Sequence, residues 1–255
     1  MKVLAIARNT AREALRNKVL YSIVGFAALV VAVAALFGSA SIGNQMKFVK
    51  DFSLAAISLF GVVIAVALGV GMLAKELGRR TILNILSKPV ARWQFIVGKF
   101  LGLVATLALV IGLMTAALLG ILAVFEGTPD WSLLVAGTGV LLELTVVVAI
   151  ALFFSAIVVT PTLAGMFTIA TFVAGRSAGY LAYFRGPQAG AVERGLADAL
   201  YWILPHLDRL DLSNRVAYGD PLAPAQLALL AAYAAAYAGI LLLLATGLFE
   251  RREFV

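Results

Sequence analysis

Long uninterrupted apolar stretches are the feature that most constrains the fold of this chain. They run for about 20 residues or more, the length that an α-helix needs to cross a hydrocarbon core of about 30 Å. The chain has 255 residues, of which 63% are hydrophobic and 13% are charged, whereas soluble domains are about 45–50% apolar and about 25% charged. A water-soluble fold of this length has no interior that could hide so much apolar surface. The sequence therefore predicts an all-α polytopic membrane protein.

The number of spans follows from where the apolar stretches are interrupted. The stretch from Ser132 to Phe184 contains only two charged residues, and as one helix it would be about 80 Å long, too long for a single crossing. It must hold two spans, with the break near residues 155–162, because Pro161 disfavours helical geometry in the residue before it. The sequence predicts one membrane domain, with an N-terminal amphipathic elbow helix at residues 1–18 and six transmembrane helices at about residues 20–39, 52–74, 95–125, 132–154, 162–184 and 225–249.

The first 18 residues form a basic amphipathic pattern. Arg8, Arg12 and Arg16 are spaced four apart, on one helical stripe, with apolar residues beside them. Such a helix lies in the headgroup plane before the first span. The alternative is a solvated basic N-terminus.

The distribution of charge predicts the orientation. Six alternating spans place residues 1–18, 75–99 and 250–255 on one side, where 13 Lys or Arg face 4 Asp or Glu. The segments on the other side carry 6 basic and 8 acidic residues. Because cytoplasmic loops are rich in Lys and Arg, both termini are predicted to be cytoplasmic, which requires an even number of spans.

The predicted outer segment, residues 185–224, has a pattern of its own. Apolar residues recur near helical spacing on both sides of Pro205: Leu196, Leu200, Ile203, Leu207 and Leu210, with Tyr201 and Trp202 among them. This pattern favours a short amphipathic helix, broken around Pro205, that rests on the outer interface of the membrane. A docking surface for a periplasmic partner protein is the alternative.

Two charged residues lie deep inside predicted spans. Glu143 is near the centre of the fourth span and Arg176 is in the fifth, where a charged side chain costs about 2.5–3.5 kcal/mol at the centre of the helix. Three interpretations remain open: a structural ion pair across a helix hairpin, a role for either residue in a translocation path, or a protonated or lipid-facing state.

Two GxxxG motifs, at Gly98 to Gly102 and at Gly175 to Gly179, allow helices to approach closely in lipid. Packing within the chain and dimerisation explain them equally well.

Most motifs for chemistry are absent. The chain has no cysteine and a single histidine, His206, which excludes thiolate chemistry and a multi-histidine metal site. It contains no phosphate-binding loop and no HExxH motif. The basic residues cluster beside apolar spans, so membrane lipid and orientation explain them better than nucleic acid. We expect no catalytic residue, no metal and no cofactor bound by this chain, so that energy for uphill movement must come from a partner or an ion gradient.

The polar segment between the second and third spans, residues 75–94, carries the most specific pattern. It reads KELGRRTILNILSKPVARWQ and continues into FIVGKFLG. This pattern resembles the cytoplasmic loop of ABC-2 type transporter permeases, especially the branch containing the permease of the nitrous-oxide-reductase maturation system. The matching positions are Glu76, Thr81, Ile82, Leu86, Ser87, Lys88, Pro89, Val90, Arg92, Gly98 and Lys99. The likeness extends over essentially the whole chain, although Gly78 is separated from Thr81 by Arg79 and Arg80 where related permeases often place the glycine directly before the threonine.

The resemblance implies a subunit that works with others. In such permeases the loop forms a coupling helix that docks in a groove of a separate ABC ATPase, which holds ATP and Mg²⁺, and two permeases and two ATPases make the working unit in the inner membrane of a prokaryote. The resemblance thus implies that Glu76, Arg79, Arg80, Thr81, Ile82, Leu86, Ser87, Lys88, Pro89 and Arg92 contact the ATPase. An amphipathic loop on anionic lipid is the competing interpretation.

Three classes of function compete. The first is an export permease, a homodimer driven by its ATPases, with a variant that transmits mechanical force to periplasmic proteins through the outer segment. The second is an ion-coupled transporter or channel that uses Glu143 and Arg176. The third, an intramembrane enzyme, is disfavoured because it needs several polar groups at one depth and only two charges are deeply buried. An internal repeat, which is common in ion-coupled transporters, is not seen across the two halves of the chain.

Overall fold

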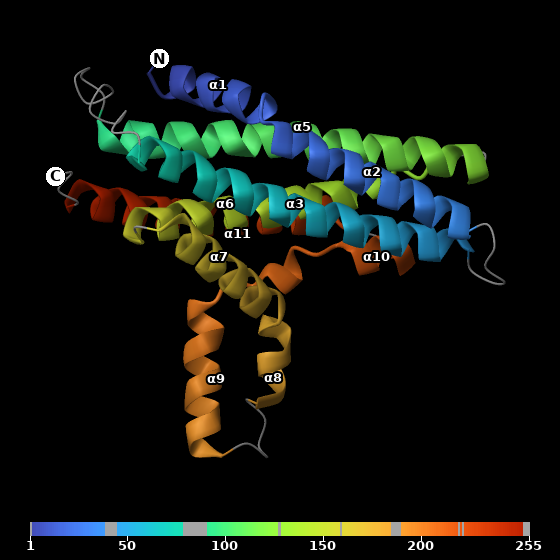
Figure 1. The fold of residues 1–255 in the computed structure, drawn as a ribbon. Helices are drawn as coiled ribbons and strands as arrows, with labels where there is room; N and C mark the ends of the chain where they lie inside the picture. Colours follow the sequence, from blue (N-terminus) through green and yellow to red (C-terminus); the bar gives the residue numbers. More distant parts are fainter. Residues whose placement is uncertain are drawn as a thin grey trace.

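Every regular element in the described part of the chain is helical. A computed structural model describes residues 2–38, 45–78, 91–126, 129–158, 160–184, 190–218, 220 and 222–251, and no strand occurs among them. The long helices lie side by side in one elongated bundle, from whose flank a helical hairpin projects (Figure 1).

The bundle is built around helix α6 (Ser132–Ile157), which packs against α3 (Gln45–Gly78), α5 (Arg92–Glu126) and α11 (Pro224–Arg251). Helix α6 is apolar on all sides, and a helix of that kind is stable only when other helices or lipid surround it. Its middle turns from Leu144 to Leu152 are almost entirely buried inside the protein. The core of the described structure therefore runs along α6.

Four of the described helices are long and apolar enough to cross a membrane, over Lys47–Met72, Arg92–Val124, Ser132–Ile157 and Pro224–Leu248. A fifth candidate is the pair formed by α1 (Lys2–Leu15) and α2 (Lys18–Gly38), which are bent by 60° relative to each other. These lengths confirm an all-α membrane protein. The count of six spans stays a prediction.

The expected single helix over residues 162–184 differs from the structure. Helix α6 ends at Ile157, and α7 (Pro161–Arg176) begins with its proline in the first turn, where the fixed φ of proline suits a helix. Ser177 leaves helical geometry, with φ −90° and ψ 2°, and the chain continues through η1 (Ala178–Tyr180) into the short α8 (Leu181–Phe184). The helix stops at Arg176 because the following segment changes direction to form the projecting hairpin (Figure 1).

The elbow helix α1 packs along α5 through the first GxxxG motif. A Cβ atom added at Gly102 would lie 2.5 Å from the carbonyl oxygen of Ala7, and one added at Gly98 would lie 2.7 Å from Cβ of Ile6. Only glycine permits so close an approach of the two backbones. This motif therefore serves packing within the chain.

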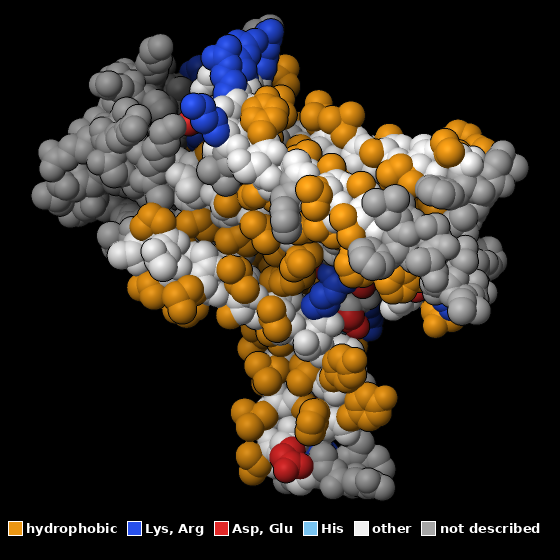
Figure 2. Space-filling model, turned by 45° about the vertical axis from the view of Figure 1, so that its right-hand side comes forward, with side chains coloured by type: hydrophobic (Ala, Val, Ile, Leu, Met, Phe, Trp, Pro, Cys, Tyr) orange, Lys and Arg blue, Asp and Glu red, His pale blue; other side chains and the backbone are white. Residues whose placement is uncertain are grey.

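The projecting hairpin consists of α8 and α9 (Ala191–Ile203), and we call these two helices the arm. After the arm the chain runs back to the bundle through residues 204–212, here called the return segment, which contains η2 (Leu207–Arg209) and leads to α10 (Ser213–Tyr218). The arm carries exposed hydrophobic side chains along its length (Figure 2). The predicted amphipathic helix corresponds to α9, which ends at Ile203, close to the predicted break around Pro205. The placement of all five apolar residues at the outer interface is wrong, because Leu196, Leu200 and Ile203 are exposed whereas Leu207 and Leu210 are buried in the core.

Candidate functional site

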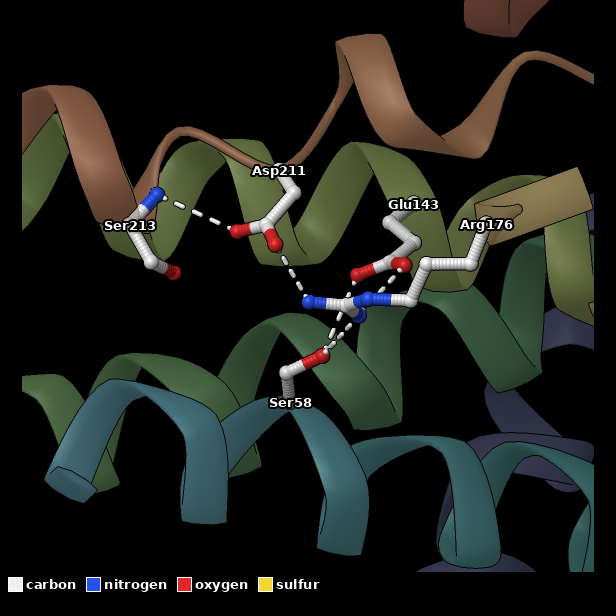
Figure 3. A network of polar contacts seen from close by, with 5 residues as sticks. All are labelled: Ser58, Glu143, Arg176, Asp211 and Ser213. Carbon is white, nitrogen blue, oxygen red and sulfur yellow. Dashed lines mark hydrogen bonds and ion pairs between the residues drawn. The ribbon is translucent and has the colours of Figure 1, made fainter. Parts of the chain in front are cut away.

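Glu143 and Arg176, the two charged residues of the long apolar stretch, meet inside the bundle. A guanidinium nitrogen of Arg176, Nη1, lies 2.8 Å from Oε1 of Glu143 (Figure 3). Glu143 is in the buried middle of α6, and its residue is 0% exposed. Arg176 is the last residue of α7, so its long side chain reaches from the end of that helix back to α6. The helix break after Arg176 thus lies beside the ion pair.

Two further elements complete the site. The hydroxyl of Ser58, on α3, accepts a hydrogen bond from Arg176 at 3.0 Å and donates one to the other carboxylate oxygen of Glu143 at 3.2 Å. The second terminal nitrogen of Arg176 binds Oδ2 of Asp211, in the return segment, while Oδ1 of Asp211 accepts a hydrogen bond of 3.1 Å from the backbone N–H of Ser213. One guanidinium therefore joins α3, α6, α7 and the return segment.

The charges of this network do not cancel within it. Two carboxylates, Glu143 and Asp211, share one guanidinium, which leaves a formal excess of one negative charge. Each carboxylate also receives a hydrogen bond from a neutral donor, Ser58 or Ser213, and the ring of Phe172 lies 5.9 Å from the guanidinium carbon. A buried charge is tolerated when it is both paired and hydrogen-bonded. Removing Arg176 would leave two carboxylates without a cation, whereas removing either carboxylate would leave one balanced ion pair.

The backbone of the return segment lies against two glycines of the bundle. A Cβ atom at Gly139 would lie 2.7 Å from the carbonyl oxygen of Leu210, and one at Gly175 would lie 2.6 Å from that of Pro205. The second GxxxG motif therefore also serves packing within the chain. The hydroxyl oxygen of Tyr233, on α11, accepts a hydrogen bond of 2.8 Å from the backbone N–H of His206. The return segment is thus held by α6, α7 and α11 together.

A second ion pair joins the start of α3 to the connection before α6. The ammonium of Lys50 lies 2.8 Å from Oδ2 of Asp130, whose other oxygen accepts hydrogen bonds from the hydroxyl and the N–H of Ser132. Partial burial raises the pKa of the Asp130 carboxyl, but Lys50 and Ser132 outweigh this effect and hold the pKa below its usual value. The carboxylate form of Asp130 is therefore stabilised in the folded protein.

The predicted ATPase-coupling residues fall mostly outside the described residues. Glu76 is in the last turns of α3 and Arg92 is the first residue of α5. The others, Arg79, Arg80, Thr81, Ile82, Leu86, Ser87, Lys88 and Pro89, lie in residues 79–90, which the structure does not describe. Among the residues that it does describe, no group of three or more His, Asp or Glu side chains could hold a metal ion.

Sequence reasoning missed Ser58 and Asp211. Ser58 is one of two serines in the apolar helix α3, and a serine in such a helix often only bonds a backbone carbonyl one turn earlier. Asp211 lies in a polar segment that holds several other charged residues, and nothing in the sequence distinguishes it from them. Only the structure shows that the adjacent Leu210 is buried, which brings Asp211 to Arg176.

The fold defines a polytopic α-helical membrane protein. Its return segment is joined to the core by the ion pair between Asp211 and Arg176 and by the burial of Leu207 and Leu210. The model of the ABC-2 family transporter protein matches residues 4–254. The chain therefore belongs to the ABC-2 transporter family. Among curated proteins no significant match was found. Membership in this family makes the chain a membrane permease subunit of an ABC transporter, which works with an ABC ATPase and does not itself carry the ATPase.

Proposed function

We propose that this permease couples ATP hydrolysis by two copies of a separate ABC ATPase, which bind ATP and Mg²⁺, to export of a substrate across or out of the membrane. It acts as a homodimer in the inner membrane of a prokaryote. The pattern of its loop supports our assignment of the chain to the branch that contains the permease of the nitrous-oxide-reductase maturation system. Six spans per chain follow if α2 and the shorter α7 are each counted as a span beside the four long helices.

The orientation that we propose has both termini in the cytoplasm. The start of α1 and the end of α11 lie at the same end of the bundle, together with the ends of α3 and α5 that flank residues 79–90 (Figure 1). The segments at this end carry the excess of Lys and Arg, which the positive-inside rule assigns to the cytoplasm. The ATPase would then bind at this end.

The observation that supports coupling most directly is the place of Ser58 on α3. This helix has 34 residues and ends at Gly78, next to the predicted coupling loop. Ser58 precedes Glu76 by 18 positions, which is about 27 Å along a helix. A continuous helix moves as one body, so a displacement at the loop would reach the hydroxyl that bonds both Glu143 and Arg176. From Arg176 the displacement passes to Asp211 and the return segment.

Co-purification tests the ATPase partner. The permease, solubilised in mild detergent from its native host, is compared with a Glu76→Ala, Arg80→Ala variant and with an Arg8→Ala, Arg12→Ala control that removes charge from the elbow helix instead. We expect an ATP-binding protein to co-purify with the wild type and the control but not with the loop variant. Absence of an ATPase from the wild type, or equal loss from both variants, would contradict coupling through the loop.

One observation favours a second function, in which the complex transmits force to a periplasmic protein. The arm projects from the bundle (Figure 1) and exposes Tyr183, Trp202 and Ile203, with 81%, 80% and 70% of each residue accessible. Exposed apolar clusters of this kind mark contact with a partner or with lipid. Replacing Trp202 and Ile203 by serine should then release a periplasmic partner while the ATPase stays bound. If transport survives without any ATPase and responds to a proton or sodium gradient, the ion-coupled alternative through Glu143 and Arg176 takes precedence.

A further inference from the structure

A cavity of about 470 Å³ lies where the elbow helix turns into the first long helix. Residues from the end of α1, the start of α2 and one face of α3 line it: Glu13, Arg16, Asn17, Lys18, Ala67, Leu68, Gly71 and Met72. The two helices α1 and α2 are bent by 60° at this point. Helix α2 packs along α3, whereas the bend turns α1 away from α3 and onto α5. This leaves a space open at the junction of α1 and α2 beside α3. The cavity is distinct from the buried network of Glu143 and Arg176, whose residues do not line it.

The lining has two chemically different halves. The rim from the elbow is polar and carries two cations, the exposed Arg16 and Lys18, against one anion, Glu13. The floor consists of side chains from α3 spaced three or four apart, with Leu68 and Met72 buried beneath it. A net positive rim over an apolar floor matches an anionic headgroup attached to an acyl chain. A soluble phosphate would use only the rim.

The depth of the cavity suits a headgroup. Gly71 precedes Lys75, the first charged residue toward the end of α3, by four positions, or about 6 Å along the helix. Lys and Arg near the ends of spans lie at headgroup level, and each contributes about 1 kcal/mol of attraction to anionic lipid. The rim is therefore near the headgroups and the floor extends toward the hydrocarbon.

Gly71 keeps the floor open. A Cβ atom added there would meet no atom within 4 Å, and the residue is exposed although it lies between buried positions of α3. This contrasts with Gly69, two positions earlier, where a Cβ would lie 2.8 Å from Cβ of Ala151. Gly69 thus serves helix packing, whereas the absence of a side chain at Gly71 leaves room for a ligand.

We propose that this cavity binds one anionic phospholipid per permease chain, with its phosphate at Arg16 and Lys18 and one acyl chain along the α3 face at Ala67 and Gly71. The lipid would fill the space between the elbow and α3. Because α3 ends beside the predicted coupling loop, the bound lipid would also fix the angle between the elbow and that helix. The proposal depends on the cavity and not on the substrate or the ATPase.

The experiment counts lipids that stay bound to the purified full-length protein. Native mass spectrometry follows the retention of phosphatidylglycerol during stepwise delipidation, with phosphatidylcholine as the uncharged comparison. The first variant, Gly71→Leu, fills the floor without removing charge, and its matched control is Gly239→Leu on α11, where an added Cβ also meets nothing within 4 Å. The second variant, Arg16→Gln with Lys18→Gln, is matched by Arg8→Gln with Arg12→Gln, which removes two exposed charges of α1 that do not line the cavity.

We expect one phosphatidylglycerol to be retained per wild-type chain, and retention to fall about thirtyfold in the Arg16, Lys18 variant and at least about tenfold in Gly71→Leu. Both controls should keep the lipid. A photoactivatable phosphatidylglycerol should label peptides containing residues 13–18 and 67–72 of the wild type, a readout that does not depend on how any variant folds. Unchanged retention in Gly71→Leu, equal losses in both charge variants, equal retention of phosphatidylcholine, or labelling that avoids these peptides would each overturn the proposal.

Discussion

The arm and the return segment are neighbours in the chain and both carry leucines at near-helical spacing, yet these leucines lie in opposite surroundings. In the arm, Leu196 and Leu200 are 61% and 45% exposed, whereas in the return segment Leu207 and Leu210 are both 0% exposed. The two pairs have nearly the same helical spacing. Spacing of leucines therefore does not decide which of them enters the core.

Contacts of the backbone and of one charged side chain account for the difference. The return segment lies against Gly139 and Gly175, where no side chain stands between the two backbones, and Asp211 binds it to Arg176. Helix α9 is instead stabilised locally, because the carboxylate of Glu193 accepts a hydrogen bond of 3.0 Å from the N–H of Gly190 at its first turn. A locally stable helix can project from the bundle, while an irregular segment must find its partners inside it.

Loss of the guanidinium should have the largest effect. Replacing Arg176 by methionine leaves two carboxylates without their cation. Removing one partner of a fully buried pair costs about 3–5 kcal/mol, and because the Arg176 side chain is 32% exposed we expect a loss at the lower end of this range. The free energy of unfolding in mixed detergent micelles measures this loss. The same change at Arg194, an exposed residue of the arm, should stay within about 0.5 kcal/mol.

A second substitution sharpens this result. Adding Glu143→Gln to the Arg176→Met variant should restore part of the lost stability, because it removes an unpaired buried charge. A double variant less stable than Arg176→Met alone would show that the network is not held together by charge.

Truncation of the leucines compares the two regions directly. Leu207→Ala removes a side chain that is fully buried and should reduce the free energy of unfolding by about 2–5 kcal/mol. Leu196→Ala in the arm should change it by less than about 0.5 kcal/mol in detergent. Equal effects at the two positions would mean that the arm is buried in the purified protein, for example against a second copy.

Glycine substitutions should act in opposite directions. An alanine at Gly175 would place its Cβ 2.6 Å from the carbonyl oxygen of Pro205, and overpacking of this kind costs about 1–3 kcal/mol. At Gly195, inside α9, an added Cβ meets nothing within 4 Å, so alanine should raise stability by up to about 1 kcal/mol through its higher helix propensity. Thermal unfolding of the two variants tests this difference in sign.

The smallest effect is expected at the partly exposed pair of Lys50 and Asp130. The pKa of Asp130 is lowered on folding from its ordinary value of 3.8, so the pair stabilises the protein above that pH and the contribution is lost as the pH falls through the folded pKa. Wild-type stability should thus decline more steeply below about pH 4 than that of Asp130→Asn. Parallel pH profiles of unfolding would show that Lys50 contributes no stability through this carboxylate.

Much of the fold could be predicted because membrane crossing is a matter of length and polarity along the chain. The long apolar stretches became α3, α5, α6 and α11. The helix over residues 162–184 could not be predicted correctly, since its interruption after Arg176 depends on the return segment that packs there. The same is true of the amphipathic pattern across Pro205, which fits an interfacial helix and is split in the structure between the arm and the core.

The residues of the candidate site could also be predicted only in part from the sequence. Glu143 and Arg176 could be identified from the sequence, because a charge in an apolar span is costly wherever its partner lies. Ser58 and Asp211 could not, because polar residues 118 and 35 positions away from Arg176 have no periodic relation to it.

The sequence by itself determined that this protein lies in a membrane and to which family it belongs. Both follow from patterns carried by residues that are close together in the chain. Only the tertiary structure decided the partners of Arg176, the use of both GxxxG motifs within the chain, and the division between arm and return segment. Each of these depends on which backbones approach closely in space. Close approach is a property of packed helices, and it leaves no regular pattern along a single chain.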